Sequence, residues 1–272
     1  MEKTDKIGTV DGLGDIYLRC LPLDRQIRAF QELGINYPYL VDTRDVVRIR
    51  LAGVSNNGTR TSVAPVSAKG ERTILIRPSP LMNLAMASYA IDAHRNNSYP
   101  TMPREFYEVA KRIAKNEESL EPEDRTAIIL SQDGDFKLTH EMPEARFSLG
   151  QAGEYFNKVN HKKIDLYNLP APDNKDLSYV NYLWFKSPQD DSDLNCGGRY
   201  LDDDSNAFGV LNKSAEGTSK KSSDHIYSLT DIRKAHLEVV PRVLAQQGVP
   251  VLESMLKKPL NEALLQELRE QH

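Results

Sequence analysis

Two aspartates flank a glycine at the end of an apolar run in IILSQDGDFKLTH, residues 128–140. Asp133 and Asp135 could supply carboxylate oxygens to Mg²⁺, and Lys137 could steady a phosphate, which is the chemistry of a metal-dependent phosphodiesterase. An Asp-Gly pair between two apolar runs is also the preferred sequence of a tight hairpin, because glycine adopts positive φ without strain. We therefore expect a hairpin here and keep a Mg²⁺-dependent nuclease at Asp133 and Asp135 as an alternative.

A second acidic stretch, DSDLNCGGRYLD at residues 191–202, places Asp191, Asp193 and Asn195 at alternate positions, with Asp202 at the twelfth. This spacing resembles the calcium loop of EF-hand proteins. The stretch departs from that pattern because Cys196 stands at the sixth position, where glycine is wanted, and the twelfth residue is Asp and not Glu. Runs of like charge are usually hydrated, so we expect a solvated acidic turn and no bound calcium.

Basic residues are concentrated between positions 44 and 81, which hold seven Lys or Arg against two acidic residues, although the whole chain carries a net charge of −4. The alternation in DVVRIRLAG, residues 45–53, predicts a strand with Arg48 and Arg50 on its exposed face. A glycine-punctuated loop that carries Arg60 and Lys69 follows. The predicted binding residues are Arg48, Arg50, Arg60, Lys69, Arg72 and Arg77.

Such a basic strand-loop-strand face predicts binding to the phosphates of DNA or RNA. The same field would attract an acidic protein partner, and it is also compatible with an ordinary solvated surface. Our leading hypothesis is a nucleic-acid-binding, non-catalytic subunit of a larger assembly. The alternatives are the phosphodiesterase and a subunit that binds only other proteins.

The elements that must position these residues follow from hydrophobic spacing and turn residues. We expect helices over residues 23–34, 79–97 and 101–118, and from Thr230 onward. We expect strands over 45–53, 72–78, 125–130, 136–142 and 178–186, with a long loop at 54–71. This order predicts an α+β fold with a central, mainly antiparallel sheet, flanking amphipathic helices and a helical C-terminus. We divide the chain into a core domain (1–211), a flexible loop or linker (212–224) and a C-terminal helical segment (225–272).

Composition places the chain in the soluble class and argues against a membrane protein. MEKTDKIGTVDG lacks the apolar segment of a signal peptide, and no window is long and apolar enough to cross a bilayer. Cys20 and Cys196 are too few and too far apart for a structural zinc site, so we expect a reducing, cytoplasmic location. The six histidines show no metal-ligand spacing. We therefore expect no cofactor and no metal ion.

Overall fold

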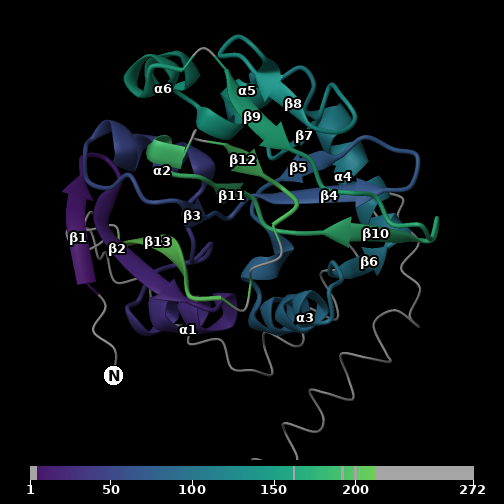
Figure 1. Cartoon of the computed structure of the whole chain (residues 1–272), viewed down its shortest axis with the longest axis horizontal. Coiled ribbons are helices and arrows are strands. Elements are labelled where there is room, and N and C mark those ends of the chain that lie inside the picture. The colour runs from purple at the N-terminus through teal and green to yellow at the C-terminus, as the bar shows by residue number, and fades with distance from the viewer. Residues whose placement is uncertain (1–4, 162, 191–192, 199–200, 202, 212–272) are drawn as a thin grey trace, which may run out of the picture. The chain divides into compact units, whose positions relative to one another are not determined.

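The computed structural model describes residues 5–161, 163–190, 193–198, 201 and 203–211. They form an α+β fold with helices around two β-sheets, and the sheets are mainly antiparallel as predicted (Figure 1). The predicted linker at 212–224 and the predicted C-terminal helices lie outside the described residues. No helix within the described residues is long and apolar enough to span a membrane.

The larger sheet has eight strands and brings distant parts of the chain together. In spatial order they are β1 (Asp5–Val10), β2 (Gly14–Leu21), β13 (Ser205–Leu211), β3 (Thr59–Arg60), β11 (Trp184–Phe185), β12 (Leu194–Asn195), β9 (Ile164–Tyr167) and β8 (Phe136–Leu138). The pairs β13–β3 and β12–β9 are parallel, and the others are antiparallel. The last described strand, β13, therefore lies between two strands from the first quarter of the chain.

The smaller sheet has five antiparallel strands. Their order is β6 (Thr101–Pro103), β10 (Leu177–Val180), β4 (Ala64–Ala68), β5 (Ile74–Ile76) and β7 (Ala127–Ile129). All five residues of β4 are buried, so this strand is covered on both faces. Such a strand shows no alternation of apolar and polar residues, because neither face meets water.

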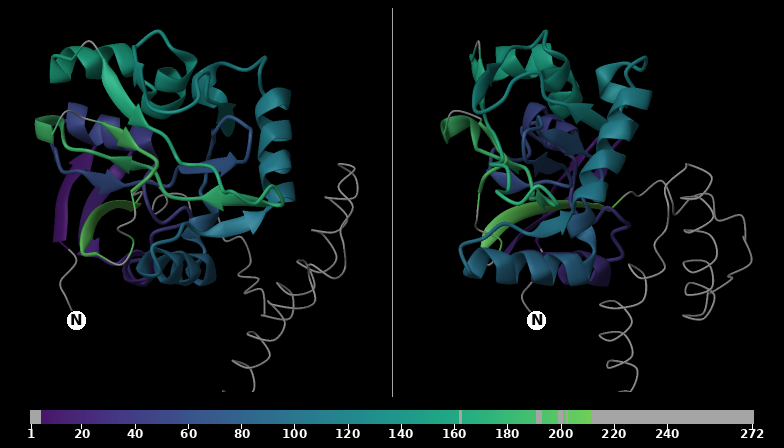
Figure 2. Two further views of the ribbon diagram at one scale, coloured as in Figure 1. Left: turned by 45° about the vertical axis from the view of Figure 1, so that its right-hand side comes forward. Right: turned by 90° about the vertical axis from the view of Figure 1, so that its right-hand side faces the viewer.

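The helices cover the sheets and close two hydrophobic clusters. They are α1 (Leu23–Glu32), α2 (Thr43–Leu51), α3 (Leu84–Arg95), α4 (Arg104–Asn116), α5 (Pro143–Leu149) and α6 (Ala152–Val159), with short 3-10 turns at Pro80–Met82, Pro122–Asp124 and Pro188–Asp190. Helices α1 and α3 lie side by side, and α4 packs along β4, β5 and β7 (Figures 1 and 2). One cluster includes residues of α2, α5 and α6, and the other includes residues of α1, α3 and α4.

Two predictions for the basic segment are wrong. Residues 45–53 do not form a strand: Asp42 caps a helix by accepting a hydrogen bond from the Arg44 backbone N–H at 2.8 Å, and α2 buries Val46, Val47 and Ile49. Residues 54–71 are not one loop, because β3 and β4 lie within them. The predicted helices over 23–34, 79–97 and 101–118 correspond to α1, α3 and α4, with the Pro80–Met82 turn preceding α3.

Candidate binding pocket

A cavity of about 340 Å³ opens where β11, β12 and the start of β13 meet. We call it the tryptophan pocket. Its lining residues are Tyr182, Trp184, Lys186, Asn195, Gly198, Asp203 and Ser205. Large aromatic rings together with small polar side chains are the composition that antibody paratopes use, because aromatic rings give contact area at low entropic cost and small polar groups adapt their hydrogen bonds.

Trp184 is fixed by the sheet beneath it. It pairs with Asn195 on β12 and with Arg60 on β3, and its side chain is partly exposed. One side of the indole packs against Gly58, where an added Cβ would lie 3.0 Å from Cζ2 of Trp184. Glycine at position 58 therefore lets the indole approach the backbone closely, and a larger residue would displace it.

Lys186 is partly exposed, and a buried carboxylate neutralises its charge. Its Nζ lies 2.8 Å from Oδ2 of Asp193, whose side chain is only 3% exposed, and 5.3 Å from the ring centre of Tyr167. A buried carboxylate holds the lysine in one orientation at the rim. The pair is neutral, so the pocket does not have the strong positive field of a phosphate site.

Arg50 anchors the C-terminal end of β11 from below. Its Nη2 donates to the carbonyl oxygens of Lys186 at 2.6 Å, Asn57 at 3.0 Å and Phe185 at 3.3 Å, and its Nη1 donates to the Tyr155 hydroxyl at 2.5 Å. The guanidinium also lies 4.0 Å from the ring centre of Phe185. Because desolvation lowers the pKa of this fully buried group, these contacts must stabilise its charge. The bonds to Phe185 and Lys186 fix the segment that carries Trp184 and Lys186.

Arg60 anchors the opposite side of the pocket in the same way. Its Nη1 donates to the Leu21 carbonyl at 2.8 Å and to Oε1 of Gln26 at 3.0 Å, and its Nη2 donates to the Asp203 carbonyl at 2.9 Å. Gln26 in turn donates to the carbonyl oxygen of Ser205. Burial lowers the pKa of Arg60, which is fully buried under the Tyr182 ring at 5.7 Å.

The predicted basic face is therefore not formed as expected. Arg50, Arg60 and Arg77 are buried and point into the protein, and Arg48 lies on a helix. Arg48 pairs with Asp45 at 3.3 Å, and Lys69 donates to the Asp173 carbonyl at 2.8 Å. Arg72 is exposed. The expectation that Arg48 and Arg50 share an exposed strand face is wrong, because α2 turns Arg50 inward by its helical period.

The Asp133–Asp135 stretch is a turn, as expected, but it is not a hairpin. Gly134 has φ of +71°, and the turn connects β7 in the smaller sheet to β8 in the larger one. Oδ1 of Asp135 accepts a hydrogen bond from the Asn168 backbone N–H at 2.7 Å. Asp135 therefore orders the connection between two loops. Within the described residues, no group of three His, Cys, Asp or Glu side chains is placed to hold a metal ion.

The calcium-like stretch is described only in part. Asp191 and Asp202 lie outside the described residues. Asp193 is paired with Lys186, and Oδ1 of Asn195 accepts from the Gly197 backbone N–H at 2.8 Å. The side-chain oxygens of both residues are therefore engaged in local structure. The expectation of a solvated turn is wrong for this part of the stretch, because Asp193 is buried and Asn195 lies in β12.

The prediction of one strand over 178–186 is wrong, because this stretch contributes to two strands: β10 (Leu177–Val180) in the smaller sheet and β11 (Trp184–Phe185) in the larger sheet. Sequence reasoning also did not identify the pocket. The usable signal was Trp184, the single tryptophan of the chain, in a region rich in Tyr, Asn, Ser, Asp and Gly. The lining residues are separated by loops, so their proximity depends on the pairing of β11 with β12 and on the return of β13 beside β3.

Comparison with known proteins identifies a fold and no family. No family model matches the chain, and no curated protein matches it. Among solved structures, a similar chain comes from work described as "Accommodation of massive sequence variation in Nanoarchaeota by the C-type lectin fold". The match covers 74% of this chain and 100% of that chain, with 13% sequence identity and a TM-score of 0.50. At this identity the similarity shows the fold alone, and the two chains share a fold.

Proposed function

We propose that this chain is a non-catalytic binding protein that recognises a protein partner through the tryptophan pocket. The observation that carries the proposal is the lining of that pocket: two aromatic rings, a lysine paired with a buried carboxylate, the exposed acidic residue Asp203 and small polar residues on a fixed frame. Tryptophan and tyrosine are the residues most enriched at binding hot spots. The proposal corresponds to the sequence-based alternative of a subunit that binds other proteins.

The two buried arginines support the proposal because they make the pocket rigid before a partner arrives. Arg50 holds the Phe185–Lys186 segment and Arg60 holds Asp203. A site that is already ordered avoids the entropic cost of ordering loops when it binds. Both anchors bond to backbone carbonyls, so the residues at the pocket surface can vary while the frame beneath them stays the same.

The fold similarity is compatible with this division of roles. The description of the similar protein attributes to the C-type lectin fold the accommodation of massive sequence variation. A frame that tolerates varied surface residues suits a binding protein, although a fold alone does not specify a function. A cytoplasmic, reducing location is part of our proposal and is supported by Cys20 and Cys196, which are both free thiols.

Nucleic-acid binding stays a prediction. It would depend on Arg48, Lys69 and Arg72, because the other three predicted residues are buried. Arg48 is on α2 and the other two are at the turn between β4 and β5, so they do not belong to one element. Neither this geometry nor the tryptophan pocket, whose lining includes the Asp203 carboxylate, favours a phosphate backbone over a protein partner.

The test compares immobilised wild-type protein with two variants in a lysate of the source cells. Trp184→Ala removes the central aromatic side chain of the pocket, and Arg72→Ala removes an exposed side chain outside it as a matched control. We expect a partner that the wild type and Arg72→Ala retain and that Trp184→Ala loses. Its affinity, measured with purified components, should fall by at least about thirtyfold in Trp184→Ala, as for a hot-spot residue. A set of retained proteins that is the same for all three would refute the proposal.

A further inference from the structure

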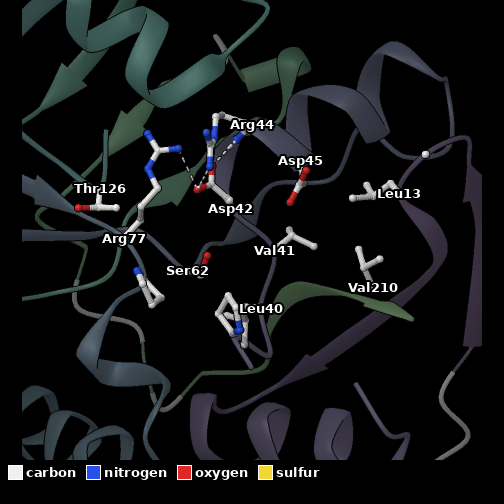
Figure 3. Close-up of a pocket in the computed structure, with 13 residues that line it drawn as sticks. Leu13, Leu40, Val41, Asp42, Arg44, Asp45, Ser62, Arg77, Thr126 and Val210 are labelled. Carbon is white, nitrogen blue, oxygen red and sulfur yellow. Dashed lines mark hydrogen bonds and ion pairs between the residues drawn. The ribbon is translucent and has the colours of Figure 1, made fainter. Parts of the chain in front are cut away.

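A second cavity, of about 460 Å³, lies at the start of α2, and we call it the α2 pocket. It shares no lining residue with the tryptophan pocket. Figure 3 shows an apolar side formed by Leu13, Leu40, Val41 and Val210. These side chains come from the β1–β2 turn, the segment before α2, and β13. The cavity is within the size range of small-molecule sites.

One end of the α2 pocket carries an excess of positive charge. The Asp42 carboxylate is shared by two guanidinium groups: Arg44 Nε lies 3.1 Å from Oδ1, and Arg77 Nη1 lies 3.1 Å from Oδ2 (Figure 3). Arg77 is buried under the Phe147 ring at 3.7 Å, whereas the Arg44 side chain is 35% exposed. Asp42 alone cannot neutralise two arginines, and Arg44 also interacts electrostatically with the more distant carboxylates of Asp45 and Glu123. The guanidinium groups therefore outnumber the carboxylates at this end of the pocket, and the compensating charge lies further away.

Arg44 also retains hydrogen-bonding capacity. It donates through Nε and Nη2 to Asp42 and through Nη1 to the Glu123 carbonyl, at 3.1, 3.2 and 2.6 Å. A guanidinium has five N–H groups, so two are left for a ligand. A carboxylate is the ligand group that matches them best.

The negative charge of Asp45 lies about one helical turn from Asp42. Asp45 lies three residues after Asp42 and therefore on the same side of α2. Asp45 pairs with Arg48, whose Nη1 lies 3.3 Å from Oδ1, and the Asp45 side chain is 30% exposed. Figure 3 places Asp45 beside the apolar side chains, away from Arg77. Its second carboxylate oxygen can accept hydrogen bonds from an ammonium group.

We propose that the α2 pocket binds a small zwitterion with an apolar side chain, of the free α-amino acid class. The ligand carboxylate would meet Arg44, its ammonium group would meet Asp45, and its aliphatic side chain would cover Leu13, Leu40 and Val210. A pure anion would lie beside Asp45 without a compensating cation. A pure cation would lie beside the excess charge of Arg44 and Arg77. A zwitterion satisfies both ends.

The test is an NMR titration of the full chain with three ligands that differ by one charged group. L-leucine carries both groups, 3-methylbutylamine lacks the carboxylate, and 4-methylpentanoate lacks the ammonium group. Each lost charged hydrogen bond should weaken binding by about tenfold or more, so leucine should bind at least about tenfold more tightly than either fragment. The proposal is overturned if a fragment binds as tightly as leucine, and this comparison needs no variant.

Two variants assign the site. Asp45→Asn should weaken leucine by about tenfold, because the ammonium contact is lost, while 4-methylpentanoate should bind at least as tightly as before, because the negative charge beside it is removed. Leu13→Trp should fill the apolar side and abolish binding of all three ligands. Circular dichroism checks that both variants are folded. An equal loss for leucine and 4-methylpentanoate in folded Asp45→Asn, or unchanged leucine binding in folded Leu13→Trp, would contradict the assignment.

Discussion

Replacing Arg50 by methionine should destabilise the protein far more than the same replacement of Arg48, which is partly exposed on the same helix. The two short bonds from Nη2, to the carbonyls of Lys186 at 2.6 Å and Asn57 at 3.0 Å, are each worth about 1.5–3 kcal/mol because the donor is charged. Methionine leaves those oxygens unpaired but recovers part of the cost of burying a cation, which is several kcal/mol. We expect the free energy of unfolding to fall by about 2–4 kcal/mol.

Urea unfolding followed by circular dichroism measures this difference, and Arg48→Met on the same helix is the control. Arg48 is partly exposed and pairs with Asp45 three residues away, so its loss should cost about 0.5 kcal/mol or less. Trp184 is the single tryptophan, so its fluorescence reports on the pocket without further labelling. Its emission should shift to the red in folded Arg50→Met. If both variants unfold at the same urea concentration with the same slope, Arg50 is not the anchor that we describe.

Three further predictions concern the pocket, acid stability and nucleic acid. Gly58→Val should push the indole of Trp184 outward, so that acrylamide quenches its fluorescence more strongly while circular dichroism is unchanged; unchanged quenching would show that the indole does not rest on Gly58. The hydrogen bond from Lys111 lowers the pKa of Glu71. The ionised Glu71 carboxylate therefore stabilises the folded protein above the ordinary carboxyl pKa of about 4.3, and this stabilisation is lost as the pH falls through the folded-state pKa. Glu71→Gln should therefore lower the free energy of unfolding by about 0.5–1 kcal/mol at neutral pH and by progressively less in acid; a loss that is constant with pH would contradict this. Neutralising Arg48, Lys69 and Arg72 should leave any oligonucleotide affinity and its salt slope unchanged if the protein-binding proposal holds, and a weaker, flatter salt dependence would instead support nucleic-acid binding.

Sequence spacing predicted helices α1, α3 and α4 and strands β5 and β7, but it missed helices α2, α5 and α6 and the buried strand β4. Helix α1 shows its apolar spacing because one side faces water, and Gly34 with φ of +77° follows its end. The strand β4 has no such pattern because it is buried on both faces. Helix α2 was mistaken for a strand because Val47, Ile49 and Leu51 alternate with arginines, while the capping role of Asp42 was not considered.

The candidate site was harder to predict because it depends on contacts between distant residues. Nothing local distinguishes a surface arginine from a buried one. Arg50 is buried because carbonyl oxygens 135 and 136 residues later in the chain accept its hydrogen bonds. Arg60 depends in the same way on a carbonyl 143 residues later. A local count of charges therefore indicated a basic face where the fold instead uses arginines as internal anchors.

The most direct test of the binding proposal is the affinity of the purified partner for wild-type protein, Trp184→Ala and Arg72→Ala, measured by calorimetry at one salt concentration. The proposal predicts a loss of at least about thirtyfold for Trp184→Ala and wild-type affinity for Arg72→Ala. If folded Trp184→Ala binds as tightly as the wild type, the tryptophan pocket is not the binding site.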